Sequence, residues 1–107
     1  MSASIIADPV LIRFREALEK MYGDRLERAV LFGSRARGDA RPDSDYDVAL
    51  SLRDFQDRWS EMDRIVPVLT DIFFDQGVFI HALPYRAGAD RERPPPMHEI
   101  RREGLDL

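Results

Sequence analysis

The sequence predicts a small α/β or α+β domain, in which a mixed β-sheet of three or more strands is flanked by helices. Three observations support this expectation. Two segments carry apolar residues at helical spacing, three shorter apolar runs have the length of strands, and turn residues separate these segments. Because 107 residues with 44% hydrophobic residues suffice for one core but not for two, we interpret residues 1–107 as a single domain.

The first predicted helix begins at Asp8-Pro9, a favourable capping pair, and residues 1–7 are expected to be disordered. Apolar residues recur at helical spacing until Gly23 ends the pattern; they are Val10, Leu11, Phe14, Leu18 and Met21. Two strands are predicted next, over 29–32 and 46–52.

A longer helix is predicted over 54–74. Its broad apolar stripe is interpreted as core; the members are Phe55, Trp59, Met62, Ile65, Val66, Leu69, Ile72 and Phe73. Pro67 lies inside this pattern, so it either kinks the helix or splits it in two.

Gly77 stops the second helix, and the apolar run over 78–84 predicts a third strand. A polar loop and a proline-rich connector are expected over 85–96, where three consecutive prolines favour an extended chain. A short C-terminal helix is predicted over 97–104.

The segment between the first two strands carries the residues that suggest chemistry. Asp45 and Asp47 stand at the head of the second strand, and because side chains alternate along a strand they project from the same face, with Tyr46 on the other. Two adjacent carboxylates repel each other unless a cation lies between them. Mg²⁺ suits such a pair, because it takes a few carboxylates and completes its shell with water and phosphate oxygens.

Donors for phosphate groups precede the two carboxylates. Gly33 can adopt a backbone conformation in which successive N–H groups converge on an anion, and Ser34 adds a hydroxyl donor. A helix that begins at Ser34 would also favour a phosphate there. Arg35 and Arg37 offer forked donors for phosphate oxygens. Carboxylates for a metal and donors for phosphates together predict a site for a metal-bound nucleotide.

Two other interpretations of this segment are simpler. Asp43, Asp45 and Asp47 have the spacing of an EF-hand loop, but Val48 stands where that loop needs glycine and the flanks read as strands, so we reject it. An ordinary polar turn explains Ser44, whose hydroxyl could hold the turn. It does not explain two acids on one face of an apolar strand.

The run Gly33-Ser34, ten residues, and Asp45-Tyr46-Asp47-Val48 resembles the signature of the DNA polymerase β-like nucleotidyltransferase superfamily. The fuller strings Phe-Gly-Ser-Arg-Ala-Arg-Gly and Ser-Asp-Tyr-Asp-Val look more narrowly like the minimal nucleotidyltransferases, antitoxins that are commonly paired with a HEPN-domain toxin. The resemblance covers about a fifth of the chain.

The resemblance implies an enzyme that uses Mg²⁺ and ATP to transfer AMP to a hydroxyl of a partner protein, expected to be a HEPN toxin, which is thereby neutralised. It implies catalytic and metal-binding roles for Asp45 and Asp47. It further implies nucleotide-binding roles for Gly33, Ser34, Arg35, Arg37 and Ser44. An oligomer within a toxin–antitoxin complex is also implied.

One departure from the family concerns its third carboxylate, which usually lies on the next core strand. No acid stands there, and the residue at that position is His81. His81 could act as a general base, since the unperturbed pKa of histidine is near neutrality, or as a weak metal ligand, or be a hydrogen-bonded histidine at the sheet edge. The departure keeps an alternative open: a binding module that neutralises its partner by occlusion, without transfer.

Composition excludes several classes of protein. The chain has no cysteine, and hence no disulfide framework or sulfur-based zinc site. No stretch predicts a signal peptide or membrane span, so we expect a cytoplasmic protein without membrane contact. The formal charge of -4 disfavours sequence-independent binding to nucleic acid.

Overall fold

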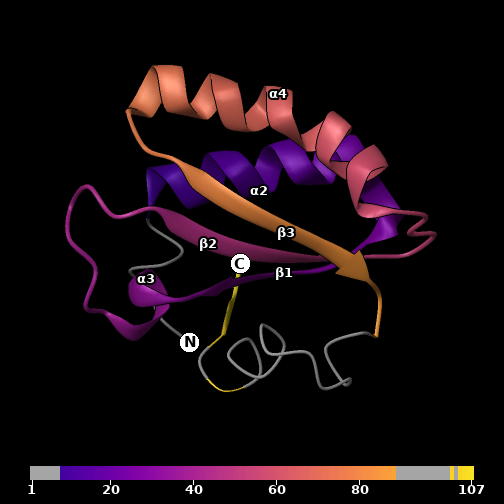
Figure 1. Ribbon diagram of the computed structural model, residues 1–107, viewed down its shortest axis with the longest axis horizontal. Helices are drawn as coiled ribbons and strands as arrows, with labels where there is room; N and C mark the ends of the chain where they lie inside the picture. Colours follow the sequence, from indigo (N-terminus) through magenta and orange to yellow (C-terminus); the bar gives the residue numbers. More distant parts are fainter. Residues whose placement is uncertain (1–7, 89–101, 103) are drawn as a thin grey trace.

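A four-stranded mixed sheet with two helices on one side forms the protein (Figure 1). The computed structural model describes residues 8–88, 102 and 104–107. Its elements are α2 (Pro9–Tyr22), η1 (Gly23–Arg25), β1 (Leu26–Phe32), α3 (Ser34–Arg37), β2 (Tyr46–Leu52), α4 (Arg58–Gln76), β3 (Ile80–Arg86) and β4 (Leu105–Asp106). The strand order is β3-β2-β1-β4, with β2 and β3 parallel and the other two pairs antiparallel. The predicted mixed sheet flanked by helices is confirmed.

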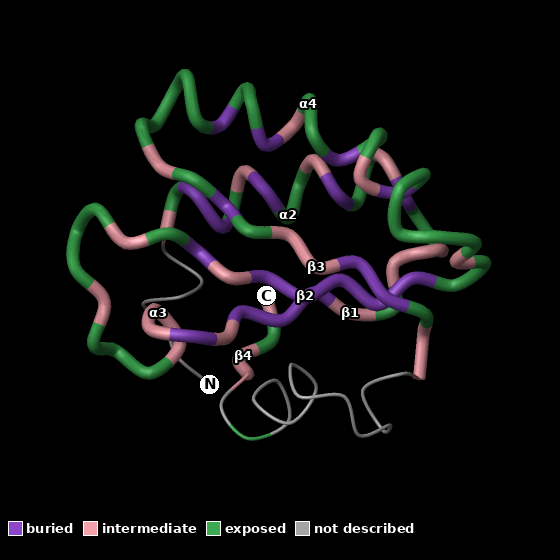
Figure 2. The backbone as a smooth tube through the Cα atoms, in the orientation of Figure 1, coloured by how far each residue is buried: buried purple, intermediate pink, exposed green. Residues whose placement is uncertain are grey.

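The main core lies between the sheet and the helices α2 and α4. Figure 2 shows the buried segments of both helices turned toward the buried strands β1 and β2. Phe14 and Leu18 of α2, Ile65 of α4 and Leu50 of β2 are fully buried there. Alternate residues of the strands form a smaller cluster around Val30, Ala49 and Tyr85.

The first helix and the second strand have the predicted limits. The Asp8 side chain accepts a hydrogen bond from the Val10 N–H at 2.9 Å and so caps α2, and Gly23 ends the helix. Strand β2 runs over the predicted residues, with Tyr46 and Val48 buried on the helix side. The alternation of side chains therefore predicted this strand correctly.

Other predicted boundaries were wrong by a few residues. Strand β1 begins at Leu26 rather than residue 29, because a register shift near Arg28 still lets this polar stretch pair with β2. Helix α4 begins at Arg58 rather than residue 54, since the Asp57 side chain accepts from the Ser60 N–H and caps the helix there. Strand β3 begins and ends two residues later than the strand predicted over 78–84, and so runs into the predicted loop over 85–96. Helix α4 also continues through Pro67 without a split.

The predicted apolar stripe of the second helix is only partly core. Ile65, Leu69 and Ile72 are buried, but Trp59 is 80% exposed, and Val66 and Phe73 are 46% and 47% exposed. A buried Glu61 takes a place on the inner side of α4, where it accepts hydrogen bonds from Tyr22 and Arg25. A charged residue with its partners on other elements cannot be recognised as inward-facing from helical spacing alone.

Some predictions fall outside the described residues. The disorder expected for residues 1–7 and the loop and connector expected beyond residue 88 lie outside the described residues. The C-terminal helix predicted over 97–104 also lies outside them, except for Arg102 and Gly104. The short strand β4 was not predicted; it pairs with β1, and Arg28 forms an ion pair with Asp106 at 2.9 Å. Among the described helices, none has the length and apolarity needed to cross a membrane.

Candidate active site

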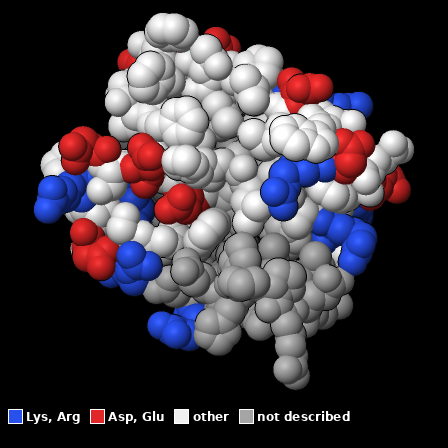
Figure 3. Space-filling view, in the orientation of Figure 1, with Lys and Arg blue, Asp and Glu red and all other residues white. Residues whose placement is uncertain are grey.

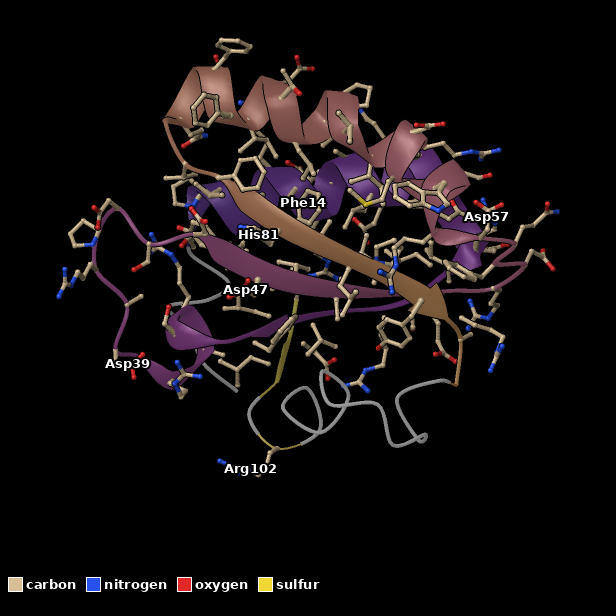
Figure 4. The ribbon with its side chains drawn as sticks, viewed as in Figure 1. Phe14, Asp39, Asp47, Asp57, His81 and Arg102 are labelled. Carbon is tan, nitrogen blue, oxygen red and sulfur yellow. The ribbon has the colours of Figure 1, made fainter. Side chains whose placement is uncertain are left out.

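Three elements bring Gly33, Asp47 and His81 together at one end of the sheet; Figure 4 labels Asp47 and His81. In the antiparallel pair, Phe32 at the end of β1 lies opposite Asp47 near the start of β2. In the parallel pair, Asp47 lies opposite His81 of β3. The turn after β1 and the starts of β2 and β3 therefore converge, as the sequence predicted for Gly33, Asp47 and His81.

Asp45 lies just before β2 and reaches across to β3. Its Oδ2 is 3.0 Å from His81 Nε2, and both side chains are about half exposed to solvent. Since Asp47 and His81 are register partners on the same face of the sheet, the contact puts Asp45 on that face too. The predicted arrangement of two aspartates on one face is the one observed.

The conformation and surroundings of residue 33 explain why the turn after β1 requires glycine. Its φ of 77° and ψ of -157° lie in a region that is essentially restricted to glycine. A Cβ atom at this position would collide with Asp47 Oδ2. The backbone of the turn and the carboxylate of β2 are thus packed directly against each other.

The expected helix start at Ser34 is present, but the helix is a single turn. α3 spans Ser34–Arg37 and is closed by Gly38 in the left-handed conformation. Four residues cannot build the macrodipole of a long helix, so any phosphate binding here depends on local N–H groups and side chains. Arg37 contacts Asp39 at 3.4 Å.

Arg35 is held by the loop that leads to Asp45. It donates to the Ser44 carbonyl at 2.7 Å and to the Pro42 carbonyl at 3.1 Å. The guanidinium also stacks on the Tyr46 ring, 4.0 Å from its centroid. The Ser44 hydroxyl accepts from the Arg41 N–H at 2.9 Å, as expected for a residue that holds the turn. Nucleotide-binding roles for Arg35 and Ser44 stay predictions.

Tyr46 and Asp8 form a contact that the sequence did not indicate. The Tyr46 hydroxyl donates to Asp8 Oδ2 at 2.8 Å, on the helix side of the sheet. Burial, and then the hydrogen bond to Asp8, raise the pKa of Tyr46 to about 12. A cavity of about 230 Å³ lies beside this pair and is bordered by Arg35 and Gly38. Only the capping role of Asp8 could be predicted, because residues 8 and 46 are far apart in sequence.

The donor set fits a hard divalent ion with an incomplete protein shell. Asp45 and Asp47 supply carboxylate oxygens, which Mg²⁺ prefers, and the close approach of Gly33 leaves no room for a side chain at residue 33 beside Asp47. In the described part of the chain, no three acidic, histidine or cysteine side chains converge as ligands. Phosphate oxygens and water would therefore have to complete the shell.

Comparison with known proteins was consistent with this geometry. The model of the nucleotidyltransferase domain matches residues 11–94, which is more than half of the chain. The chain belongs to the nucleotidyltransferase domain family. The matched region of this nucleotidyltransferase domain contains all the predicted site residues, from Gly33 to His81.

Two similar proteins come from Methanocaldococcus jannaschii. "Putative protein adenylyltransferase MJ0604" is 34% identical over 70 residues, which cover 65% of this chain and 64% of that relative. The chain thus spans slightly less than two thirds of its length. "Putative protein adenylyltransferase MJ0141" is 26% identical over 77 residues, with 72% of this chain and 77% of that relative covered.

A solved structure has the same fold. The crystal structure of a toxin-antitoxin with AMP-PNP superposes with a TM-score of 0.64 and 16% identity, over 89% of this chain and 69% of that chain. At this identity, the similarity establishes the nucleotidyltransferase-like fold. It assigns no residue roles.

Proposed function

We propose that this chain is a protein adenylyltransferase that transfers AMP from Mg-ATP to a hydroxyl of a partner protein. The observation that carries the proposal is the packing of Gly33 against Asp47, with Asp45 and His81 on the same face. This packing brings the turn that we propose to bind phosphate beside two carboxylates. Family membership and the names of the two archaeal relatives support the same class of reaction.

In this proposal Asp45 and Asp47 would hold Mg²⁺, whose charge offsets that of the triphosphate. The backbone of Gly33 and the hydroxyl of Ser34 would bind the phosphates, and Arg37 would offset charge on the leaving group. The acceptor oxygen forms a bond to the α-phosphorus, and the bond from the α-phosphorus to the bridging oxygen breaks. Pyrophosphate leaves with that electron pair, and the hydroxyl proton passes to solvent.

The partner proposed here is a toxin of the HEPN type. The fold shared with a chain of a toxin-antitoxin structure containing AMP-PNP supports a toxin and an adenine nucleotide, and the sequence motif supports the HEPN class. In the described region, the sheet and its helices form no second lobe that could hold a small acceptor. This favours an acceptor protein that is supplied in trans.

The proposal is tested by incubating the purified chain with ATP labelled at the α-phosphate and lysate from its own host. The wild type and Asp43→Asn, which removes a nearby exposed carboxylate, should label protein in the presence of Mg²⁺. Asp45→Asn and addition of EDTA should abolish the label. Undiminished labelling by a folded Asp45→Asn protein would refute the assignment of this carboxylate.

A binding module that acts by occlusion is the second candidate function. Two observations favour it: no acid faces Asp47 from β3, and three ligands do not converge in the described residues. Occlusion would survive both EDTA and an Asp47→Asn change, whereas transfer would not. Inhibition of the partner that persists under both conditions would establish this alternative.

A further inference from the structure

An exposed apolar surface lies on the outside of α4 and continues toward the candidate active site. Trp59 and Phe74 are 80% exposed, and Val66 and Phe73 are nearly half exposed. A groove between α4 and Phe79 runs along this surface; it is bordered by Met62, Val66, Leu69, Thr70, Phe73, Phe74 and Phe79. We call the exposed part of these residues, together with Trp59, the α4 patch. Figure 3 shows an uncharged area over the C-terminal part of α4, with acidic side chains at the active-site end and further charged side chains around the N-terminal part of α4.

The spacing of the α4 patch fits a helix as its occupant. Trp59, Val66 and Phe73 are exposed and seven residues apart. Met62 and Leu69 lie between them at the alternating spacing of three and four residues, but they pack against the core and form only the floor of the groove. This is the pattern by which one helix receives the apolar side chains of another. Ile65 and Ile72 face the core, and the buried Leu69 lies where the core side of α4 meets the patch.

The area of the patch fits a stable protein interface. The exposed fractions of its five most exposed members correspond to on the order of 500 Å² of apolar surface, given the usual size of aromatic side chains. A standard interface buries about 800 Å² on each partner, somewhat more than half of it apolar. The patch alone could therefore supply the apolar centre of such an interface.

Phe79 connects the α4 patch to the reacting groups. It borders the groove, and its ring also contacts the His81 ring edge-on with centroids 5.0 Å apart. His81 in turn lies 3.0 Å from Asp45. Phe79 and His81 thus link the groove to Asp45 at the edge of the sheet.

We propose that the α4 patch docks an amphipathic helix of the adenylylated protein and brings its acceptor hydroxyl to Asp45 and Asp47. This inference rests on the proposed transferase function. It identifies the acceptor as a protein with an apolar helical face. It also gives the exposed aromatic residues of α4 a role in substrate choice.

The patch variant carries Val66→Ser and Phe74→Ser together. The matched control is Asp71→Ser, which changes an exposed residue elsewhere on α4. In the lysate-labelling assay, Asp71→Ser should match the wild type, and the double patch variant should lose at least tenfold in initial rate. Binding of AMP-PNP with Mg²⁺, followed by thermal shift, should stay unchanged in all three proteins. Equal labelling by the patch variant would overturn the proposal.

Two further measurements separate the other outcomes. Sedimentation of the purified wild type should show a monomer; a dimer that the patch variant dissociates would mean that a second copy covers the patch, which overturns the proposal. If the wild type labels no protein, the transferase function fails. Docking is then judged from a photo-crosslinker placed at position 59. A cross-link to an apolar helical segment that Phe74→Ser abolishes supports docking, and the absence of any such cross-link overturns it.

Discussion

Two clusters, each made of a tyrosine, an arginine and a carboxylate, lie at opposite ends of the sheet. In the first, the Tyr22 hydroxyl donates to Glu61, and Arg25 stacks on the tyrosine ring and pairs with Glu61 at 2.6 Å. In the second, the Tyr46 hydroxyl donates to Asp8, and Arg35 stacks on the tyrosine ring.

The two clusters differ in what the arginine binds. Arg25 donates to the Arg53 and Asp54 carbonyls and also pairs with the carboxylate of its own cluster, Glu61, which is 3% exposed, so the buried charge is compensated locally. Arg35 donates to carbonyls of the loop that leads to Asp45. The first cluster therefore joins α2, α4 and the loop before α4, whereas the second holds the loop that leads to the candidate active site.

The largest expected effect on stability comes from the first cluster. Glu61→Ala leaves Arg25 and the Tyr22 hydroxyl without their shared acceptor, and we expect a loss of about 3 kcal/mol in the free energy of unfolding. Urea unfolding followed by circular dichroism measures this. The control Asp106→Asn removes an exposed ion pair and should cost less than about 1 kcal/mol. Equal losses in the free energy of unfolding would mean that the buried ion pair contributes no more to stability than the exposed one.

The turn at Gly33 should be the next most sensitive position. Gly33→Ala and Gly38→Ala both force an alanine to a positive φ, but only the former also drives a Cβ into Asp47. We expect Gly33→Ala to cost about 2 kcal/mol and Gly38→Ala about 1 kcal/mol. AMP transfer should fall at least tenfold for Gly33→Ala alone. Similar transfer rates for the two variants would show that the packing of Gly33 against Asp47 is not needed for transfer.

Arg35→Met tests whether the second cluster positions the loop. The variant keeps an apolar stem near Tyr46 but removes the donors to Pro42 and Ser44, so we expect about 1 kcal/mol of lost stability. Transfer should fall about tenfold, because Asp45 follows this loop. The matched control is Arg41→Met, in the same loop, which should behave like the wild type. A wild-type rate for Arg35→Met would contradict the positioning role.

The smallest expected effect is a dependence of stability on alkaline pH. The pKa of Tyr46 is raised to about 12 in the folded state, from about 10 in an unfolded chain. The neutral phenol is thus favoured by folding, so its contribution is complete below pH 10 and is lost as the pH rises toward 12. Unfolding measured at about pH 8 and about pH 11 should show a decrease in the free energy of unfolding on the order of 1 kcal/mol, which Tyr46→Phe reduces.

Burial also raises the pKa of Tyr22, so Tyr22→Phe is a parallel variant and the double variant should show the smallest decrease. A decrease that is identical in Tyr46→Phe and the wild type would show that this phenol does not contribute.

Local sequence signals predicted most of the fold. Asp8 and Gly23 gave the limits of α2, and the alternating pattern gave β2, because capping and side-chain alternation depend on neighbouring residues. The start of α4 was missed because Asp54 and Asp57 both resemble caps, and only the latter binds the helix N-terminus. Strand β4 has two residues and is stabilised by β1, so no local pattern reveals it.

The candidate site was predicted in its residues but not in its contacts. The motif placed Gly33, Asp45 and Asp47 together, and the structure added the reason that residue 33 is glycine. The hydrogen bond from Tyr46 to Asp8 and the ring contact between Phe79 and His81 depend on tertiary packing, which spacing in the sequence does not encode. The exposed Trp59 and Phe73 were interpreted as core because helical periodicity does not show what covers a second apolar face.

The most direct test of this account is the intact mass of the partner that co-purifies with the tagged chain from its own host. The measurement is made with the wild type, with Asp45→Asn and with Asp43→Asn. We predict a partner that is heavier by one or more adenylyl groups with the wild type and Asp43→Asn, and of unmodified mass with Asp45→Asn. A partner with the same added mass from a folded Asp45→Asn chain, or with no added mass from any of the three, would contradict the assignment of this end of the sheet as an active site.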